Sequence, residues 1–271
     1  MPYIRRGIFD THAHYDDEAF DEDRDELLAK LPAQGIARVV NVGSSPQSCV
    51  RTMELAEKYE YIYAALGVHP SETAQMDEAF FERLREMCQW KRCVAVGEIG
   101  LDYYWDEPER EIQKKWFVRQ LELARECELP VVIHSREAAK DTADLMAAQR
   151  AGEIGGVVHC FSYTKETARI FLDMGFYIGV GGVLTFKNGK KLREAAEYVP
   201  MDRIVLETDC PYLAPEPYRG KRNSSLYLPY VVAALAQVKG ITEEEVREAA
   251  WNNGMKLYRM TQPKEIDSNT Q

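Results

Sequence analysis

The sequence contains five histidines, and each of them falls at the end of a short apolar run or just after it. They are His12, His14, His69, His134 and His159. The acids Glu98, Asp102 and Asp209 occupy equivalent places. Imidazole nitrogens combined with carboxylate oxygens suit Zn²⁺, Mn²⁺ or a similar ion, whereas an all-oxygen set would favour Mg²⁺ or Ca²⁺. These residue types therefore indicate a metal site with hydrolytic chemistry.

The spacing of these residues supports metal binding. On a strand, His12 and His14 point to the same face, so both imidazoles can chelate one ion. Glu98 stands inside the apolar run CVAVGEIG, where an unpaired carboxylate is costly unless a cation neutralises it. Asp209 follows IVLET, and its carboxylate can bind an ion and take a proton from water. The nearby Glu207 either orients a ligand or forms a structural salt bridge.

Six residues are more than one tetrahedral ion needs. Two divalent ions (Zn²⁺, Mn²⁺ or Mg²⁺) about 3.5 to 4 Å apart, bridged by Glu98, would use all of them and leave room for a shared hydroxide. His69 on its own is ambiguous, because a lone histidine near a strand end is as often a packing residue as a functional one. The expected metal ligands are His12, His14, Glu98, His134, His159 and Asp209.

Short apolar runs rich in β-branched residues predict the strands that position this chemistry. They cover residues 8–12, 38–42, 61–68, 94–99, 131–134, 157–159, 177–180 and 204–207. Such runs are typical of parallel strands covered on both faces. Helical patterns alternate with them at residues 21–34, 46–59, 78–89, 108–129, 137–150, 165–174, 189–198, 226–239 and 242–258.

This alternation predicts an α/β fold, a (β/α)₈ TIM barrel formed by a single domain. The chain of 271 residues has no long Gly/Ser/Pro-rich linker, so we expect the barrel to occupy residues 1–260 and a polar tail to follow at 261–271. The carboxyl ends of all barrel strands meet at one mouth, where active sites lie. A doubly wound open sheet is the alternative, but it would not explain why the histidines gather at strand ends.

The formal charge of −10 argues against a protein that coats nucleic acid non-specifically. It leaves room for a local basic patch. Arg219, Lys221 and Arg222 follow the last strand, where they either grip phosphates or form a solvated basic turn. Arg136, near the His134 strand, is a further candidate for binding substrate.

Three aromatic residues, Tyr103, Tyr104 and Trp105, follow the Glu98 strand. They either offer a stacking surface to unpaired bases or plug the core.

The six cysteines include no C-x-x-C pair, so neither a zinc knuckle nor a disulfide framework is indicated. The start of the chain lacks the features of a secretory signal. No apolar stretch approaches the roughly 20 residues that span a bilayer. We therefore expect a cytoplasmic protein that does not interact with membranes. A monomer is a separate expectation.

Six motifs occur in a characteristic order: FDTHAHYD, GVHP, GEIGLDYYWD, PVVIHSREA, VVHCFS and ETDCPYLAPEPYRGKRN. Together they closely resemble the TatD family of metal-dependent deoxyribonucleases, from residue 8 to about residue 258. The resemblance implies a TIM barrel of the amidohydrolase type, two divalent ions, and hydrolysis of DNA phosphodiesters by a 3′-5′ exonuclease.

Carried over by motif, the resemblance implies that His12, His14 and Asp209 hold the first ion. His134 and His159 would hold the second, with Glu98 as the bridge. It also implies that His69 faces the scissile phosphate rather than a metal.

The chain departs from the family pattern at two places. Tyr163 stands after HCFS, where the family usually has glycine, and Ser224-Ser225 stand after GKRN, where it usually has Glu-Pro. The predicted metal ligands are untouched, so we expect these departures to affect substrate contacts.

The predicted function is hydrolysis of single-stranded DNA through a hydroxide activated by two metal ions. Asp209, Glu98 and His69 are the expected catalytic residues. One alternative keeps the site but hydrolyses a small-molecule ester, amide or phosphoester, since fold does not fix function. A second alternative is a non-catalytic metal-binding or nucleic-acid-binding protein, which would require a missing ligand or proton acceptor.

Overall fold

The structure is a computed structural model that describes residues 7–261. Its eight parallel strands pair in the order in which they occur along the chain. They are β1 (Ile8–Ala13), β2 (Ile36–Val42), β3 (Ile62–Leu66), β4 (Cys93–Asp102), β5 (Val131–Arg136), β6 (Gly156–Val158), β7 (Tyr177–Val180) and β8 (Ile204–Leu206). The helices are α1 (Arg24–Lys30), α2 (Pro46–Lys58), α3 (Glu78–Cys88), α4 (Arg110–Glu126), α5 (Ala139–Ala148), α6 (Lys165–Asp173), α7 (Lys190–Tyr198), α8 (Leu228–Lys239) and α9 (Glu243–Leu257).

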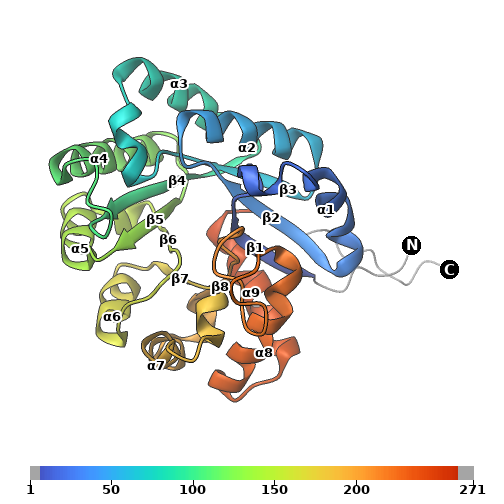
Figure 1. Cartoon of the computed structure of the whole chain (residues 1–271). Coiled ribbons are helices and arrows are strands. Elements are labelled where there is room, and N and C mark those ends of the chain that lie inside the picture. Colours follow the sequence, from blue (N-terminus) through green and yellow to red (C-terminus); the bar gives the residue numbers. More distant parts are fainter. Residues whose placement is uncertain (1–6, 262–271) are drawn as a thin grey trace.

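The sheet closes on itself between its first and last strands. Ala13 and Cys210 form a parallel bridge. The backbone N–H of His14 donates to the Cys210 carbonyl at 2.8 Å, and that of Asp209 donates to the His12 carbonyl at 2.9 Å. The helices surround this ring of strands (Figure 1). The predicted (β/α)₈ barrel is therefore confirmed.

Burial of apolar side chains on both faces of the sheet stabilises the barrel. Every residue of β1 and β4 is buried, as expected for parallel strands covered by helices. One apolar cluster joins strand residues to α9, where the ring of Phe9 lies 5.9 Å from those of Trp251 and Tyr258. A larger cluster combines residues of the strands with residues of the helices, α9 included.

The prediction of one helix over residues 21–34 is wrong. Residues 24–30 form α1, which is flanked by the short 3₁₀ helices Glu18–Phe20 and Pro32–Gln34. Proline has no N–H to continue an α-helix and restricts the residue before it, so the α-helix ends ahead of Pro32.

The strand predicted at 94–99 is longer than expected. In the structure β4 continues to Asp102, because Gly100 pairs with His134 and Asp102 with Arg136 on β5. The φ of Gly100 is +148°, and a Cβ there would lie 1.9 Å from the His134 carbonyl oxygen. Only glycine lets the two strands approach at this point.

The predicted polar tail lies outside the described residues from position 262 onward. The boundary at residue 260 therefore stays a prediction. Among the helices of residues 7–261, none is both long enough and apolar enough to cross a membrane. The cytoplasmic location and the monomeric state also stay predictions.

Candidate metal centre

The predicted ligands converge at the carboxyl ends of the strands, although they come from distant parts of the chain. Three groups of residues each have their potential ligand atoms within 4.8 Å of one another, and the first two groups share His12. The groups are His12, His14 and Asp209; His12, Glu98 and His159; and His69, Asp102 and His134.

Glu98 lies at the middle of this arrangement. Its Oε1 is 2.7 Å from His134 Nδ1 and 2.6 Å from His159 Nε2. Its Oε2 is 3.4 Å from His12 Nε2 and 3.5 Å from His14 Nε2. Burial opposes ionisation of Glu98, but the surrounding imidazoles outweigh it and hold the pKa of this carboxyl well below its usual range. Each carboxylate oxygen thus faces a different pair of histidines.

Asp209 completes the group around the first histidine pair. The Nε2 atoms of His12 and His14 are only 3.0 Å apart. Asp209 Oδ1 lies 3.6 Å from the first and 3.4 Å from the second. The side chain of Asp209 is 17% exposed, whereas that of Glu98 is 4% exposed. Asp209 is therefore the more accessible of the two carboxylates.

Hydrogen bonds on the far side of two rings fix their orientation. His14 Nδ1 lies 2.8 Å from the Val42 carbonyl oxygen. His134 Nε2 lies 3.0 Å from Asp102 Oδ2. A proton held on each of these nitrogens leaves the other ring nitrogen facing the centre. Burial lowers the pKa of both rings, but the hydrogen bonds and charges of the neighbouring carboxylates outweigh it and raise the pKa of His14 to about 10 and that of His134 to about 9. A cation bound at the centre would therefore displace a proton from each ring.

The rings of His12 and His159 stack on each other at 4.0 Å with an interplanar angle of 7°. Within residues 7–261, the Nδ1 atoms of both rings are buried without a hydrogen-bond partner. Their Nε2 atoms both point towards Glu98. The stack therefore holds one donor from each histidine pair beside the same carboxylate.

His69 lies at the edge of the same centre. Its Nε2 is 3.7 Å from Glu98 Oε1, and its ring meets that of His134 edge-on at 4.2 Å. The backbone N–H of Ser71 donates to Nδ1 at 3.2 Å. Burial lowers the pKa of His69 to about 3. The ring is therefore neutral, with its proton on Nε2, the nitrogen that faces the centre.

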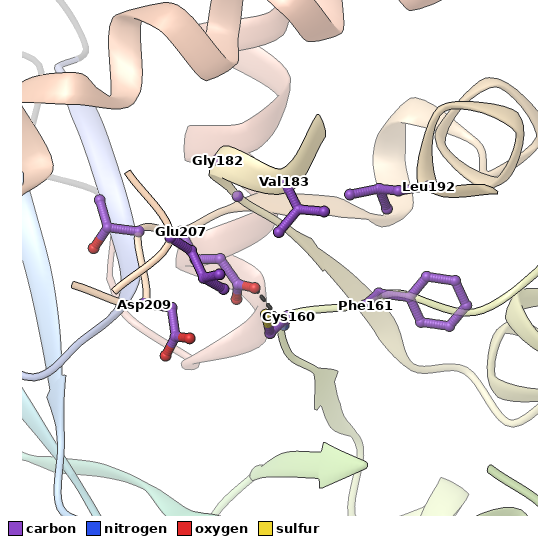
Figure 2. Close-up of a pocket in the computed structure, with 10 residues that line it drawn as sticks. Cys160, Phe161, Gly182, Val183, Leu192, Glu207 and Asp209 are labelled. Atoms are coloured by element: carbon purple, nitrogen blue, oxygen red, sulfur yellow. Dashed lines mark hydrogen bonds between the residues drawn. The ribbon is translucent and has the colours of Figure 1, made fainter. Parts of the chain in front are cut away.

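Glu207 lies in a cavity of about 10 Å³ beside Asp209 and Cys160 (Figure 2). The backbone N–H of Cys160 donates to its Oε1, and its Oε2 has no partner among the described residues. Burial raises the pKa of Glu207 well above its usual range. A Cβ at position 179 would lie 2.3 Å from its Oε2, so a larger residue than Gly179 would have to displace the Glu207 carboxyl group.

Of the two interpretations left open for Glu207, the structure favours the positioning one. Among the described residues Glu207 forms no ion pair, and its hydrogen bond holds the backbone directly after His159. Figure 2 shows its carboxyl group directed at Cys160.

The predicted substrate residues of the basic loop after β8 differ in their surroundings. Arg222 donates through two nitrogens to Asp23 and also to the Ala19 carbonyl. The guanidinium of Arg219 lies 4.3 Å from the ring of Phe186. Neither Arg219 nor Lys221 forms an ion pair with any residue between positions 7 and 261. Arg222 therefore holds the loop in place, whereas the side chains of Arg219 and Lys221 stay available to bind anions.

The aromatic residues after β4 also differ from one another. Tyr103 donates its hydroxyl to Asp141 at 2.8 Å, and the Arg110 guanidinium covers its ring at 4.0 Å. Tyr104 and Trp105 are 51% and 64% exposed. Tyr103 is thus a packed residue, and its predicted contact with substrate stays a prediction.

The two departures from the family pattern lie in the scaffold. Ser225 is fully buried, and its hydroxyl donates to Asp10 Oδ2 at 2.6 Å. Ser225 begins the 3₁₀ helix Ser225–Tyr227 and contacts β1 through Asp10. The effect of this departure on substrate contacts stays a prediction. The hydroxyl of Tyr163 lies 3.0 Å from Ser135 Oγ and accepts from the Ala138 N–H at 3.2 Å.

Comparison with known proteins agrees with this geometry. The profile of a family described as TatD related DNase matches residues 9–259, a range that contains every candidate ligand. The chain belongs to the TatD-related DNase family.

Two curated relatives span nearly the same length. The metal-dependent hydrolase YabD of Bacillus subtilis is 41% identical over 253 residues, which cover 93% of this chain and 99% of the relative. The metal-dependent hydrolase YcfH of Escherichia coli K12 is 36% identical over 256 residues, which cover 93% and 96%.

A solved TatD-family structure supports the barrel. The crystal structure of YjjV, a TatD homologue from Escherichia coli K12, matches with a TM-score of 0.89 and 31% identity, covering 96% of this chain and 100% of that one. A phosphotriesterase homology protein from Escherichia coli, solved with phosphate in its active site, matches with a TM-score of 0.64 at 13% identity. That likeness shows the fold alone.

Proposed function

We propose that this TatD-family protein is a metal-dependent hydrolase that cleaves phosphodiester bonds of DNA, as a 3′-5′ exonuclease on single strands. The observation that carries the proposal is the position of Glu98, whose two carboxylate oxygens face separate histidine pairs. A buried carboxylate among five imidazoles fits a bridge between cations. The description of the family as DNases supports DNA as the substrate.

The donor set fits two divalent ions. His12, His14 and Asp209 would hold one, and His134 with His159 would hold the other, with Glu98 between them. Nitrogen and oxygen ligands suit Zn²⁺ or Mn²⁺, and Mg²⁺ is a third candidate. When bound, such ions activate water as a nucleophile and neutralise the charge on the phosphoryl oxygens.

The side chains of the chain itself have separate tasks in this proposal. Asp209, the more exposed carboxylate, accepts the proton of the attacking water. His69 carries a proton on Nε2, so it donates a hydrogen bond to an oxygen of the scissile phosphate. Arg219 and Lys221 bind neighbouring phosphates.

The proposal is tested by the release of mononucleotides from single-stranded DNA with each of the three metals. Glu98→Gln and Asp209→Asn should lower kcat at least about 100-fold, because both remove a charge that the reaction needs. Asp144→Asn is the matched control, since Asp144 is exposed on α5 and pairs only with Lys140 among the described residues. Undiminished release in either site variant would contradict the assignment.

The same reactions separate the alternatives. Hydrolysis of small esters, amides or phosphoesters without any release from DNA would favour a small-molecule hydrolase. Tight binding of DNA without turnover at any metal would favour a binding protein. Among the described residues, none of the six expected ligands is missing from the centre, which supports catalysis.

A further inference from the structure

Tyr104, Trp105 and Arg136 form an exposed cluster, here called the aromatic platform. The rings of Tyr104 and Trp105 lie 5.1 Å apart, nearly perpendicular to each other. The guanidinium of Arg136 lies 3.8 Å from the centre of the Tyr104 ring and 6.0 Å from that of Trp105. Large aromatic side chains are usually buried, so this adjacent pair, with 51% and 64% of its surface exposed, offers apolar area to a ligand.

A single carboxylate joins this platform to the candidate metal centre. Asp102 Oδ1 accepts the backbone N–H of Tyr104 at 2.9 Å and that of Trp105 at 3.1 Å. Its other oxygen, Oδ2, faces His134 Nε2 at 3.0 Å. In the register of β4 and β5, the backbone of Arg136 lies opposite that of Asp102. Arg136 follows His134 by two residues, so the side chains of Arg136 and His134 lie on the same face of β5. The platform therefore stands at the barrel mouth, directly beside the centre.

The charge of Arg136 is available to a ligand. Neighbouring cations are occupied: Arg110 pairs with Asp106, and Lys114 pairs with Asp141. With the part of the chain that the structure describes, Arg136 forms no ion pair. A guanidinium held on an aromatic face, with exposed rings around it, suits a phosphate that carries a planar base.

We propose that the aromatic platform binds the nucleotide next to the scissile phosphate. Its base stacks on the ring of Trp105, and Arg136 binds its outer phosphate. The base must be unpaired, because both faces of a base within a duplex are covered by its neighbours. The platform thus selects single-stranded DNA, and this inference rests on the proposed function.

The kinetic test compares two single strands that differ at one nucleotide. One strand is intact, and the other carries an abasic residue beside the bond to be cut. In Trp105→Ala we expect KM for the intact strand to rise about tenfold, since base stacking on an aromatic ring has an effect of this order. KM for the abasic strand should stay unchanged, because its abasic nucleotide has no base that could stack on Trp105 in the wild type.

Two further variants serve as controls. Trp105→Phe should restore most of the preference for the intact strand. Tyr198→Ala removes an aromatic residue that is 47% exposed at the end of α7, on the opposite end of the barrel, and should leave both KM values unchanged. Equal KM values for Trp105→Ala and the wild type on the intact strand would overturn the proposal, even if DNA is hydrolysed.

A binding test is independent of turnover. Of the four tryptophans, Trp105 is 64% exposed, Trp116 and Trp251 are each 4% exposed, and Trp90 is half-buried against the core. A stacked base should therefore quench mainly Trp105. We expect oligothymidylate to quench the fluorescence of full-length Glu98→Gln, a blunt duplex not to do so, and Trp105→Phe in the same background to abolish quenching. Quenching without DNA hydrolysis in the wild type would support the platform and reject the proposed nuclease. Quenching that persists in the Trp105→Phe background would overturn the platform.

Discussion

Asp102 holds a proton on Nε2 of His134, because its Oδ2 accepts from that nitrogen at 3.0 Å. The other nitrogen, Nδ1, lies 2.7 Å from Glu98 Oε1 and is the one that a bound cation would engage in place of a proton. A carboxylate behind a ligating histidine both orients the ring and makes it a better donor. The capacity of His134 to bind a cation thus depends on a residue that need not touch the metal.

The substitution Asp102→Asn tests this dependence. The asparagine oxygen can still accept from Tyr104 and Trp105, but its amide would donate towards His134 Nε2 and force the proton onto Nδ1. We expect metal affinity to fall about 10-fold to 100-fold, measured by calorimetric titration of the metal-free protein. Asp141→Asn, whose carboxylate pairs with Tyr103 and Lys114 outside the centre, is the control. An affinity equal to that of the wild type would contradict this role of Asp102.

The sequence identified residues whose chemistry is visible in their type. His12, His14, Glu98 and Asp209 could be predicted because each follows or occupies an apolar strand. The Val42 carbonyl that orients His14 could not, since every residue has a carbonyl. The pairing of Arg222 with Asp23 was also missed, because it joins residues 199 positions apart.

At the scale of elements, Asp10 joins the first and last strands where the barrel closes, a junction here called the seam. It is fully buried on β1 and accepts hydrogen bonds from the Thr208 backbone at 3.0 Å, the Thr208 hydroxyl at 2.7 Å and the Ser225 hydroxyl at 2.6 Å. These donors belong to the segment after β8, which carries Asp209. The seam therefore positions His12 and Asp209 relative to each other.

Replacing Asp10 with alanine should destabilise the metal-free protein by about 3 to 5 kcal/mol, because several buried donors lose their acceptor. Urea unfolding in the presence of a chelator measures this change. Asp144→Ala, which removes an exposed pair with Lys140, should change the free energy of unfolding by less than about 0.5 kcal/mol. A loss below about 1 kcal/mol in Asp10→Ala would show that the seam does not depend on this carboxylate.

Sequence periodicity predicted the number and order of the strands but not every boundary. The alternation of apolar runs and helical patterns is a local property, so it could be seen directly. The extension of β4 to Asp102 depends on pairing with β5 through Gly100, which is a tertiary contact. The Asp10 network was missed for the same reason, although an acid inside the buried run IFDTHA was a signal that a partner must exist.

At the scale of the whole molecule, the candidate DNA-binding groups stand on opposite sides of the barrel mouth. Arg136 lies at the end of β5, and Arg219 and Lys221 follow β8. Because the strands pair in sequence order around a closed ring, these positions flank the centre. The net charge of the whole chain, −10, disfavours non-specific binding of DNA. The charge distribution therefore suits an enzyme that binds a DNA strand only at the barrel mouth.

Metal binding should stabilise the folded barrel as a whole. At a metal concentration 100 times Kd, the gain is about 2.7 kcal/mol, which corresponds to a rise in Tm of roughly 5 to 10 °C for a domain of this size. Differential scanning calorimetry with and without chelator measures it. Glu98→Gln should lose most of the rise, and an undiminished rise in that variant would place the metal elsewhere.

Anomalous diffraction from a crystal of the wild-type protein loaded with Mn²⁺ tests the central claim most directly. We predict two peaks about 3.5 to 4 Å apart, one among His12, His14 and Asp209 and the other between His134 and His159, with Glu98 bridging them. The absence of any peak at these side chains, or peaks only at other faces of the barrel, would contradict the account.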